Sequence, residues 1–250
     1  KKLMSYQIQL EEKEVLAIQE YNFGKLYLVS VPIGNLLDFT DRAKIILKEV
    51  DIILCEEYQV ANQFLKHLSI DKPLIALNEH TEKNEIENII NELKSGKNIA
   101  MISDHGTPLI EDPGLKVVQS AIKNNIVITS IPGASSILSA LILSGFDTKK
   151  FLYYGLLSPK TDERKKELFN LKSIIYTIIL LDTPYRLERL LSDVCSIFGK
   201  NREVSLSMNL TTESESTIRG NIEYVLNYIK DNKIKKCEFV LVIKGNSQKK

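Results

Sequence analysis

The sequence is poor in cysteine, and the few cysteines that it has are far apart. Three occur among the 250 residues, namely Cys55, Cys195 and Cys237, and they form no Cys-x-x-Cys pair. Each lies in an apolar segment, where burial as a small apolar residue is the usual role. We therefore expect free thiols and a reducing, cytoplasmic compartment rather than a disulfide framework.

Long apolar segments and metal-ligand motifs are also lacking. The longest apolar runs, such as residues 173–181, are far shorter than the roughly 20 residues that a membrane-spanning helix needs. Lys1 and Lys2 precede no apolar stretch, so we expect neither a signal peptide nor a membrane anchor. No spacing of cysteine, histidine or carboxylate side chains indicates a metal site, and we expect none.

An excess of one charge is missing as well. The 33 basic side chains oppose 32 acidic ones, which leaves a formal net charge of +1. A nucleic-acid coat protein is usually more basic, so any contact with RNA must come from a local patch. Hydrophobic residues make up 44% of the chain and charged residues 26%, a composition that predicts a packed globular protein and argues against extensive disorder.

Apolar segments of strand length alternate with amphipathic segments of helix length along most of the chain. Residues 1–23 are polar and form a predicted N-terminal extension. Strands are then predicted at 25–32, 51–55, 74–77, 98–103 and 126–131, and helices at 38–49, 59–68, 84–95, 112–124 and 134–144. Such an alternation predicts an α/β domain with a mainly parallel sheet.

A second block of strands and helices begins near Phe151, after the predicted boundary at residues 145–150. Strands are predicted at 151–157, 174–181, 203–208 and 238–244, helices at 162–172, 184–198 and 222–230, and a polar stretch at 211–220. We therefore expect two α/β domains, residues 24–147 and residues 148–246.

Three unusual loops follow predicted strands, at residues 32–41, 104–114 and 132–136. Ligands of parallel sheets bind beyond the carboxyl ends of the strands, which makes these loops candidates for a site. The first loop contains Gly34, which allows close approach of a ligand, but it lacks the Gly-x-Gly-x-x-Gly pattern of dinucleotide-binding proteins. A plain strand-to-helix turn is the alternative for this loop.

The second loop is longer than a connection needs and holds two glycines, two prolines and three acids. The carboxylate of Asp104 could accept hydrogen bonds from a ligand, and His105 is a candidate base without a visible partner. Asp112 is better explained as the N-cap of the following helix. In the third loop, Ser135 and Ser136 stand at a helix start that suits an anion, although Ser135 could simply cap the helix.

In their order and spacing, these segments resemble one protein family. The matching segments are 26–35 (Leu-Tyr-Leu-Val-Ser-Val-Pro-Ile-Gly-Asn), 38–40, 103–114, 132–135, 153–157, 182–186, 218–220 and 238–242. The family is the tetrapyrrole methylase superfamily, and within it the branch that methylates ribose 2′-oxygens of 16S ribosomal RNA. The resemblance covers roughly residues 25–245.

The resemblance implies a fold, a cofactor and a set of binding residues. It implies the two-domain tetrapyrrole-methylase fold, with a mainly parallel sheet in the first α/β domain and a mixed sheet in the second, a homodimer, and S-adenosylmethionine as the methyl donor. By position, the donor contacts fall on Ile33, Ile102, Ser103, Asp104, Thr107, Ser135, Ser136, Leu181, Asp182 and Met208. Leu181 and Met208 are apolar enough to line a slot for adenine.

The resemblance also implies methyl transfer to a ribose hydroxyl of RNA in the small ribosomal subunit. Because a hydroxyl is a poor nucleophile, a base near the acceptor would help. Glu79, Glu56 and His80 are the candidates, since they match family positions near strand ends. A solvated acid is the alternative for Glu79, and favourable charge at a helix start is the alternative for Glu56.

Several substrate-side motifs depart from the family's pattern. The family's Glu-Asp-Thr-Arg reads Glu-Glu-Tyr-Gln at 56–59, its Tyr-His-Glu-His reads Leu-Asn-Glu-His at 77–80, its Arg-Glu-Leu-Thr reads Met-Asn-Leu-Thr at 208–211, and Leu109 replaces a glycine. Two alternatives therefore stay open: methylation of a tetrapyrrole or another small acceptor, and a donor-binding protein without turnover.

A basic run and several tyrosines are further candidates for RNA contact. Lys160, Arg164, Lys165 and Lys166 could hold phosphates, although a charged helix face is the usual explanation of such a run. Tyr153, Tyr154 and Tyr185 could stack on a base, with packing in strands as their alternative.

Overall fold

The structure is a computed structural model that describes residues 22–77 and 82–246. Contacts divide these residues into two units. The first is drawn from residues 22–28, 45–101 and 113–130, and the second from residues 29–44, 102–112 and 131–246. The loops of residues 29–44 and 102–112 are therefore counted with the C-terminal part of the chain, although they follow strands of the first sheet.

Five strands form the first sheet, in the order β3-β2-β4-β1-β5. The strands are β1 (Leu26–Val29), β2 (Ile52–Cys55), β3 (Leu74–Ala76), β4 (Ile99–Ile102) and β5 (Ile128–Ile131). β2 pairs in parallel with both β3 and β4, and every residue of β2 and β4 is buried. Burial on both faces explains why these strands are continuously apolar, and the predicted parallel sheet is confirmed.

Helices join these strands close to the predicted positions. They are η1 (Leu36–Asp38), α2 (Asp41–Glu49), α3 (Tyr58–His67), α4 (Glu82–Lys94) and α5 (Leu115–Lys123). The predicted N-cap at Asp112 is wrong, because α5 begins only after Gly114, whose φ of 115° takes the chain into the helix. At 13 residues α4 is the longest helix in the described part of the chain, and none there is long and apolar enough to cross a membrane.

The second sheet also has five strands, in the order β6-β7-β10-β8-β9. The strands are β6 (Phe151–Leu156), β7 (Thr177–Leu181), β8 (Glu203–Met208), β9 (Ser216–Asn221) and β10 (Phe239–Ile243). β6 and β7 are parallel, whereas β10 is antiparallel to β7 and β8, and β8 is antiparallel to β9. The mixed sheet that the resemblance implied is confirmed.

Strand β9 lies within the segment that the sequence predicted only as a polar stretch. Its sequence Ser-Thr-Ile-Arg-Gly-Asn contains a single apolar side chain. The strand stands at the edge of the sheet and none of its residues is fully buried. Backbone pairing with β8 forms this strand. The strand lacks the alternation of apolar and polar residues by which a strand is predicted from sequence.

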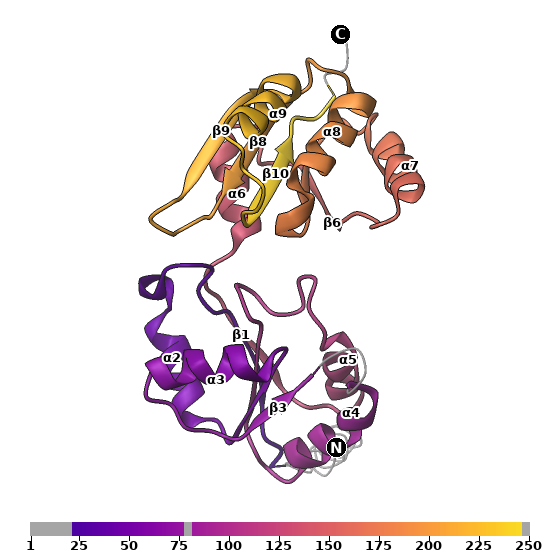
Figure 1. The fold of residues 1–250 in the computed structure, drawn as a ribbon. Coiled ribbons are helices and arrows are strands. Elements are labelled where there is room, and N and C mark those ends of the chain that lie inside the picture. Colours follow the sequence, from indigo (N-terminus) through magenta and orange to yellow (C-terminus); the bar gives the residue numbers. More distant parts are fainter. Residues whose placement is uncertain (1–21, 78–81, 247–250) are drawn as a thin grey trace, which may run out of the picture. The chain divides into compact units, whose positions relative to one another are not determined.

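Helices cover both faces of the second sheet (Figure 1). These are α6 (Ser136–Ser144), α7 (Thr161–Leu171), α8 (Leu187–Phe198) and α9 (Ile222–Asp231), and the short helix η2 (Pro184–Arg186) precedes α8. Alternate residues of β10 enter different apolar clusters. Leu241 joins the cluster that α8 and α9 complete, whereas Val240 and Val242 join the one that α6 completes. The core of this unit therefore has two layers, one on each side of the sheet.

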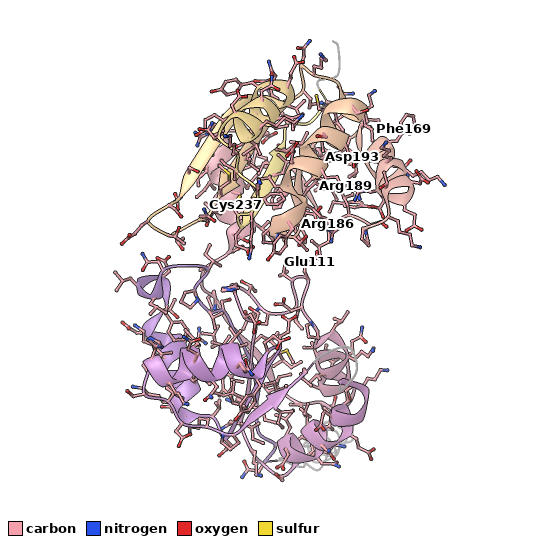
Figure 2. The ribbon with its side chains drawn as sticks, viewed as in Figure 1. Glu111, Phe169, Arg186, Arg189, Asp193 and Cys237 are labelled. Carbon is pink, nitrogen blue, oxygen red and sulfur yellow. The ribbon has the colours of Figure 1, made fainter. Side chains whose placement is uncertain are left out.

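Arg164 of α7 belongs to this core and not to the surface. Its side chain is 1% exposed, its Nε donates to Oδ2 of Asp193 at 2.8 Å, and its Nη1 donates to the carbonyl oxygens of Ser158 and Pro159. Asp193 lies on α8 (Figure 2). The interpretation of Arg164 as a phosphate contact is therefore wrong, because its guanidinium is committed to joining α7 and α8.

Removal of either partner of this ion pair should strongly destabilise the fold. Arg164→Ala or Asp193→Ala leaves an uncompensated buried charge, for which we expect a loss of about 3–5 kcal/mol in the free energy of unfolding. Urea denaturation at neutral pH measures this loss. Lys165→Ala, on the same helix, is the matched control and should change the free energy by less than about 0.5 kcal/mol. Equal values for all three variants would contradict a structural role of the pair.

Candidate functional site

Three loops that follow β1, β4 and β5 are joined by direct contacts. These strands are neighbours in the first sheet, with β1 between the other two. The N–H of Val31 donates to the carbonyl oxygen of Gly106 at 2.8 Å, and the N–H of Gly106 donates to that of Pro32 at 3.4 Å. The loops after β1 and β4 therefore form one backbone layer at the carboxyl ends of the strands, where ligands of such sheets bind.

Hydroxyl groups connect the third loop to this layer. Oγ1 of Thr107 donates to the carbonyl oxygen of Ala134 at 3.3 Å, and it lies 3.1 Å from Oγ of Ser30. Because a threonine hydroxyl has one proton, Ser30 is the donor in the second contact. Thr107, a predicted donor contact, is thus occupied in holding all three loops. The role of Ser30 was not predicted, and a serine at a strand end carries no sequence signal for it.

Ser103 is likewise committed to the shape of its own loop. The side chain is buried, and its Oγ is 3.0 Å from the carbonyl oxygen of His105 and 3.2 Å from that of Gly106. Ile102, just before it, is buried in β4. We infer that both residues set the path of the loop, while Asp104, which is half-buried, has the exposure that a ligand contact requires.

The loop after β4 turns through several left-handed residues. Gly106 has a φ of 76°, and a Cβ atom there would lie 3.1 Å from Cγ2 of Ile33, so glycine permits the close approach of the first two loops. Leu109 and Glu111 also have positive φ angles, of 72° and 67°. A side chain in this conformation costs about 1 kcal/mol or more, which explains physically why the resembled family has glycine where this chain has Leu109.

Glu111 ties the same loop to the second sheet. Its Oε1 accepts a hydrogen bond from the hydroxyl of Tyr153 at 2.7 Å. Burial, and then this hydrogen bond, raises the pKa of Tyr153. β6 has an irregular register between Tyr153 and Gly155, and a Cβ on Gly155 would collide with the Glu111 carboxylate. Tyr153 therefore positions the loop and is not a free stacking surface.

The third loop ends at a capped helix start. Oγ of Ser135 accepts a hydrogen bond from the N–H of Leu138 at 3.4 Å, so the expected cap is confirmed. Ser136 is the first residue of α6, and both serines are half-buried. The first-turn dipoles of α6 favour an anionic group at this point.

Of three apolar residues predicted to contact the methyl donor, two pack against one apolar cluster and the third belongs to another. Ile33 and Leu181 both pack against the cluster that α6 forms with β7 and β10. The side chain of Met208 is buried in the other cluster, on the opposite face of the sheet. The backbone of Met208 nevertheless remains near, because Met208 and Leu181 pair with the consecutive residues Phe239 and Val240 of β10.

Asp182, directly after β7, is the most unusual polar group of this region. Its side chain is 1% exposed, and its Oδ1 accepts from the N–H of Thr183 at 2.7 Å and lies 3.1 Å from Nε of Arg186. Among the described residues, its Oδ2 and Nη1 of Arg186 are buried without a hydrogen-bond partner. A buried acceptor beside a buried donor is costly unless a ligand or water completes it. Figure 2 labels Arg186 at the start of α8.

Of the candidates for a catalytic base, the structure describes only Glu56 and His105. Glu56 is half-buried and follows β2, just before α3. Glu79 and His80 lie outside the described residues. His105 is exposed. Within residues 22–77 and 82–246, no three His, Cys, Asp or Glu side chains gather as metal ligands would.

The described groups fit a ligand that is polar at several points and apolar between them. Oδ2 of Asp182 can accept a hydrogen bond, the start of α6 suits a carboxylate, and Ile33 and Leu181 offer apolar contact. S-adenosylmethionine has an ammonium group, hydroxyls, a carboxylate and an adenine, so its chemistry fits this set of residues.

Comparisons with known proteins find relatives that match most of the chain. The family described as Tetrapyrrole (Corrin/Porphyrin) Methylases matches residues 25–225. A ribosomal RNA small subunit methyltransferase I from Rickettsia prowazekii is 42% identical over 224 residues, which are 89% of this chain and 79% of the relative. The protein of that name from Bacillus subtilis is 40% identical over 226 residues, 90% of this chain and 77% of the relative.

Solved structures share the fold at much lower identity. Diphthine synthase has a TM-score of 0.70 at 14% identity, covering 89% of this chain and 90% of its own. A cobalt precorrin-4 methyltransferase of cobalamin biosynthesis has a TM-score of 0.63 at 15% identity, covering 90% and 95%. These two similarities show the fold alone.

The pH dependence of stability tests the environment of Asp182. Burial raises the pKa of this carboxyl above its ordinary value of 3.8. Its contribution to stability is therefore present below that value and lost as the pH rises through the folded-state pKa. Asp182→Asn has no charge to bury, so the melting temperature of wild type relative to this variant should fall as the pH rises from 3.8 through the raised pKa of Asp182. Calorimetric melting curves measure it, and a constant or rising difference would contradict the burial.

Proposed function

Because the chain belongs to the tetrapyrrole (corrin/porphyrin) methylase family, and is therefore an S-adenosylmethionine-dependent methyltransferase, we propose that it methylates a ribose 2′-oxygen of 16S ribosomal RNA in the small ribosomal subunit. The names of the relatives that share about two fifths of its residues carry this proposal. The three joined loops at the carboxyl ends of β4, β1 and β5 support it, since they form the site that a donor needs.

In this proposal, residues of the three joined loops and residues at the end of β7 hold the methyl donor. Asp104 and Oδ2 of Asp182 accept hydrogen bonds from its ammonium or hydroxyl groups, and the start of α6 at Ser135 and Ser136 faces its carboxylate. Ile33 and Leu181 contact its apolar part. Backbone of residues 102, 103, 107 and 208 completes the site, because the side chains at these positions are committed elsewhere.

The protein contributes mainly orientation to the reaction. When bound, S-adenosylmethionine supplies an electrophilic methyl group on a positively charged sulfur. The chain's residues have to place the acceptor oxygen in line with that group and exclude water, and positioning of this kind accounts for a large share of catalytic rate enhancement. The hydrogen-bonded loops suit this task because their backbone is fixed before any ligand binds.

A base that takes the proton of the ribose hydroxyl would add to this effect. Glu79 remains our first candidate, with Glu56 and His80 behind it, because these residues match the family's positions near strand ends. Glu56 is half-buried at the carboxyl end of β2, just before α3.

We also propose that the chain works in the cytoplasm as a homodimer. Its three cysteines are free, as expected, and two of them, Cys55 and Cys237, are buried while Cys195 is half-buried. Large apolar side chains remain exposed on α5 and α6, at Leu115, Ile122 and Ile142. Such side chains are typical of interfaces between copies, and light scattering of the purified protein would test the dimer.

Transfer to ribosomal subunits tests the function directly. We expect label from methyl-labelled S-adenosylmethionine to enter the RNA of small subunits that lack their own ribose methylations, and nuclease digestion should place it on a 2′-oxygen. Normally methylated subunits are the matched control and should take up none. Label in a tetrapyrrole acceptor, or donor binding without any transfer, would favour one of the two alternatives instead.

Donor binding and proton removal should separate in two variants. Asp104→Ala removes a carboxylate that accepts hydrogen bonds from S-adenosylmethionine, so calorimetry should show the affinity for S-adenosylmethionine reduced by about tenfold or more.

Glu79→Gln keeps the size of the side chain but removes its basicity, so single-turnover transfer should slow while the affinity for S-adenosylmethionine stays within about twofold. Unchanged affinity in the first variant would remove Asp104 from the site, and an unchanged rate in the second would exclude Glu79 as the base.

A further inference from the structure

An exposed aromatic ring stands beside the proposed donor site. Tyr185 is the middle residue of η2 and follows Asp182 by three positions, at the carboxyl end of β7. Tyr185 is 73% exposed, more than the other exposed tyrosines of the described chain. An exposed ring at this position is free to contact a ligand, since most of its surface is not used in packing.

A cation from a distant part of the sequence contacts this ring. Nζ of Lys236 lies 4.6 Å from the centroid of the Tyr185 ring, within the distance of a cation–π contact. The hydrogen bond with the Tyr185 side chain raises the pKa of Lys236, so its ammonium stays charged. Lys236 belongs to the segment before β10, the strand that pairs with β7. The two residues therefore meet at one end of the second sheet.

The segment that carries Lys236 is basic on its exposed side. Lys233, Lys235 and Lys236 are exposed, and Glu238 is the one acid that acts on Lys236 in the described chain. Glu238 and Asp231 flank them, so the segment from 231 to 238 has three cations against two acids. The side chain of Arg186 is turned inward to Asp182 and adds nothing to this surface.

We propose that Tyr185 and Lys236 form the contact surface for the acceptor RNA, in which the ring stacks on a base and the lysines hold phosphates. The inference rests on the proposed function and names the part of the protein that recognises its substrate. Unpaired bases stack on aromatic side chains, and lysines near such a ring neutralise the adjoining phosphates. The position three residues beyond Asp182 brings this surface next to the donor.

The contact also explains how the chain can bind RNA with a net charge of only +1. A local cluster of three lysines supplies attraction where it is needed, and stacking supplies the rest without further charge. The basic run on α7 cannot take this role as a whole, because Arg164 is buried and Lys160 is paired with Glu163.

The test compares variants of this surface in transfer to small ribosomal subunits that lack their own ribose methylations. Tyr185→Leu should raise the KM for subunits by about tenfold, the effect of losing one stacked base, while kcat and the Kd of S-adenosylmethionine stay within about twofold. Tyr185→Phe keeps the ring and should stay close to wild type. Lys236→Gln should raise KM and reduce its dependence on salt concentration.

Two exposed residues away from this surface serve as matched controls. Tyr224→Leu removes a tyrosine that is 54% exposed at the start of α9, and Lys172→Gln removes a lysine at the end of α7; both should leave KM unchanged. The binding of small subunits, measured by filter retention with donor present, is followed alongside transfer in every variant.

The outcomes separate this inference from the proposed function. If wild type methylates subunits and Tyr185→Leu does so with the same KM, the inference is overturned and the function stands. If Tyr185→Leu instead weakens donor binding tenfold, the ring belongs to the donor site and the inference is equally overturned. If wild type binds the donor but neither binds nor methylates subunits, the proposed function fails and the inference fails with it.

Discussion

The hydrogen bonds that join the loops after β1, β4 and β5 are the constraint on which the site depends. Backbone contact between Val31 and Gly106, and the hydroxyl contacts of Thr107 with Ser30 and Ala134, fix three separate segments in one layer. Because these bonds are internal, the layer exists before a ligand binds, and binding costs correspondingly less conformational entropy. Residues that resemble donor contacts by position thus act partly by holding the backbone that the donor would meet.

Two buried ion pairs of the second unit, Arg164 with Asp193 and Asp182 with Arg186, have different roles. Nε and Nη1 of Arg164 donate hydrogen bonds and its Nη2 lies 2.7 Å from Oδ2 of Asp193, so this pair joins two helices. Asp182 and Arg186 are also paired, but each keeps one buried atom without a partner among the described residues. Within the described chain, each pair keeps one buried arginine nitrogen without a hydrogen-bond partner, but of the two pairs only that of Asp182 also has a buried carboxylate oxygen without one, and it stands directly after a strand. Burial alone does not distinguish the two cases.

The departures from the family's motifs have different physical consequences. Leu109 occupies a left-handed position that favours glycine, so this chain carries local strain in the long loop without losing its path. The replaced residues around Glu56 change the charge at the end of β2, where the family has an arginine. The acceptor contact that we propose for Tyr185 and Lys236 needs none of the replaced side chains.

The sequence by itself determined the class of the fold and the position of the loops, because apolar periodicity and the turn residues that end each strand are local properties. It also determined the family, through motifs whose order and spacing survive. Only the tertiary structure decided that Arg164 is buried, that Met208 points into the other cluster, that α5 begins after Gly114, and that β9 is a strand. The burial of Arg164 and Met208 depends on partners distant in sequence, and β9 depends on backbone pairing at a sheet edge. The start of α5 depends on the left-handed conformation of Gly114, and apolar patterns along the sequence encode none of these features.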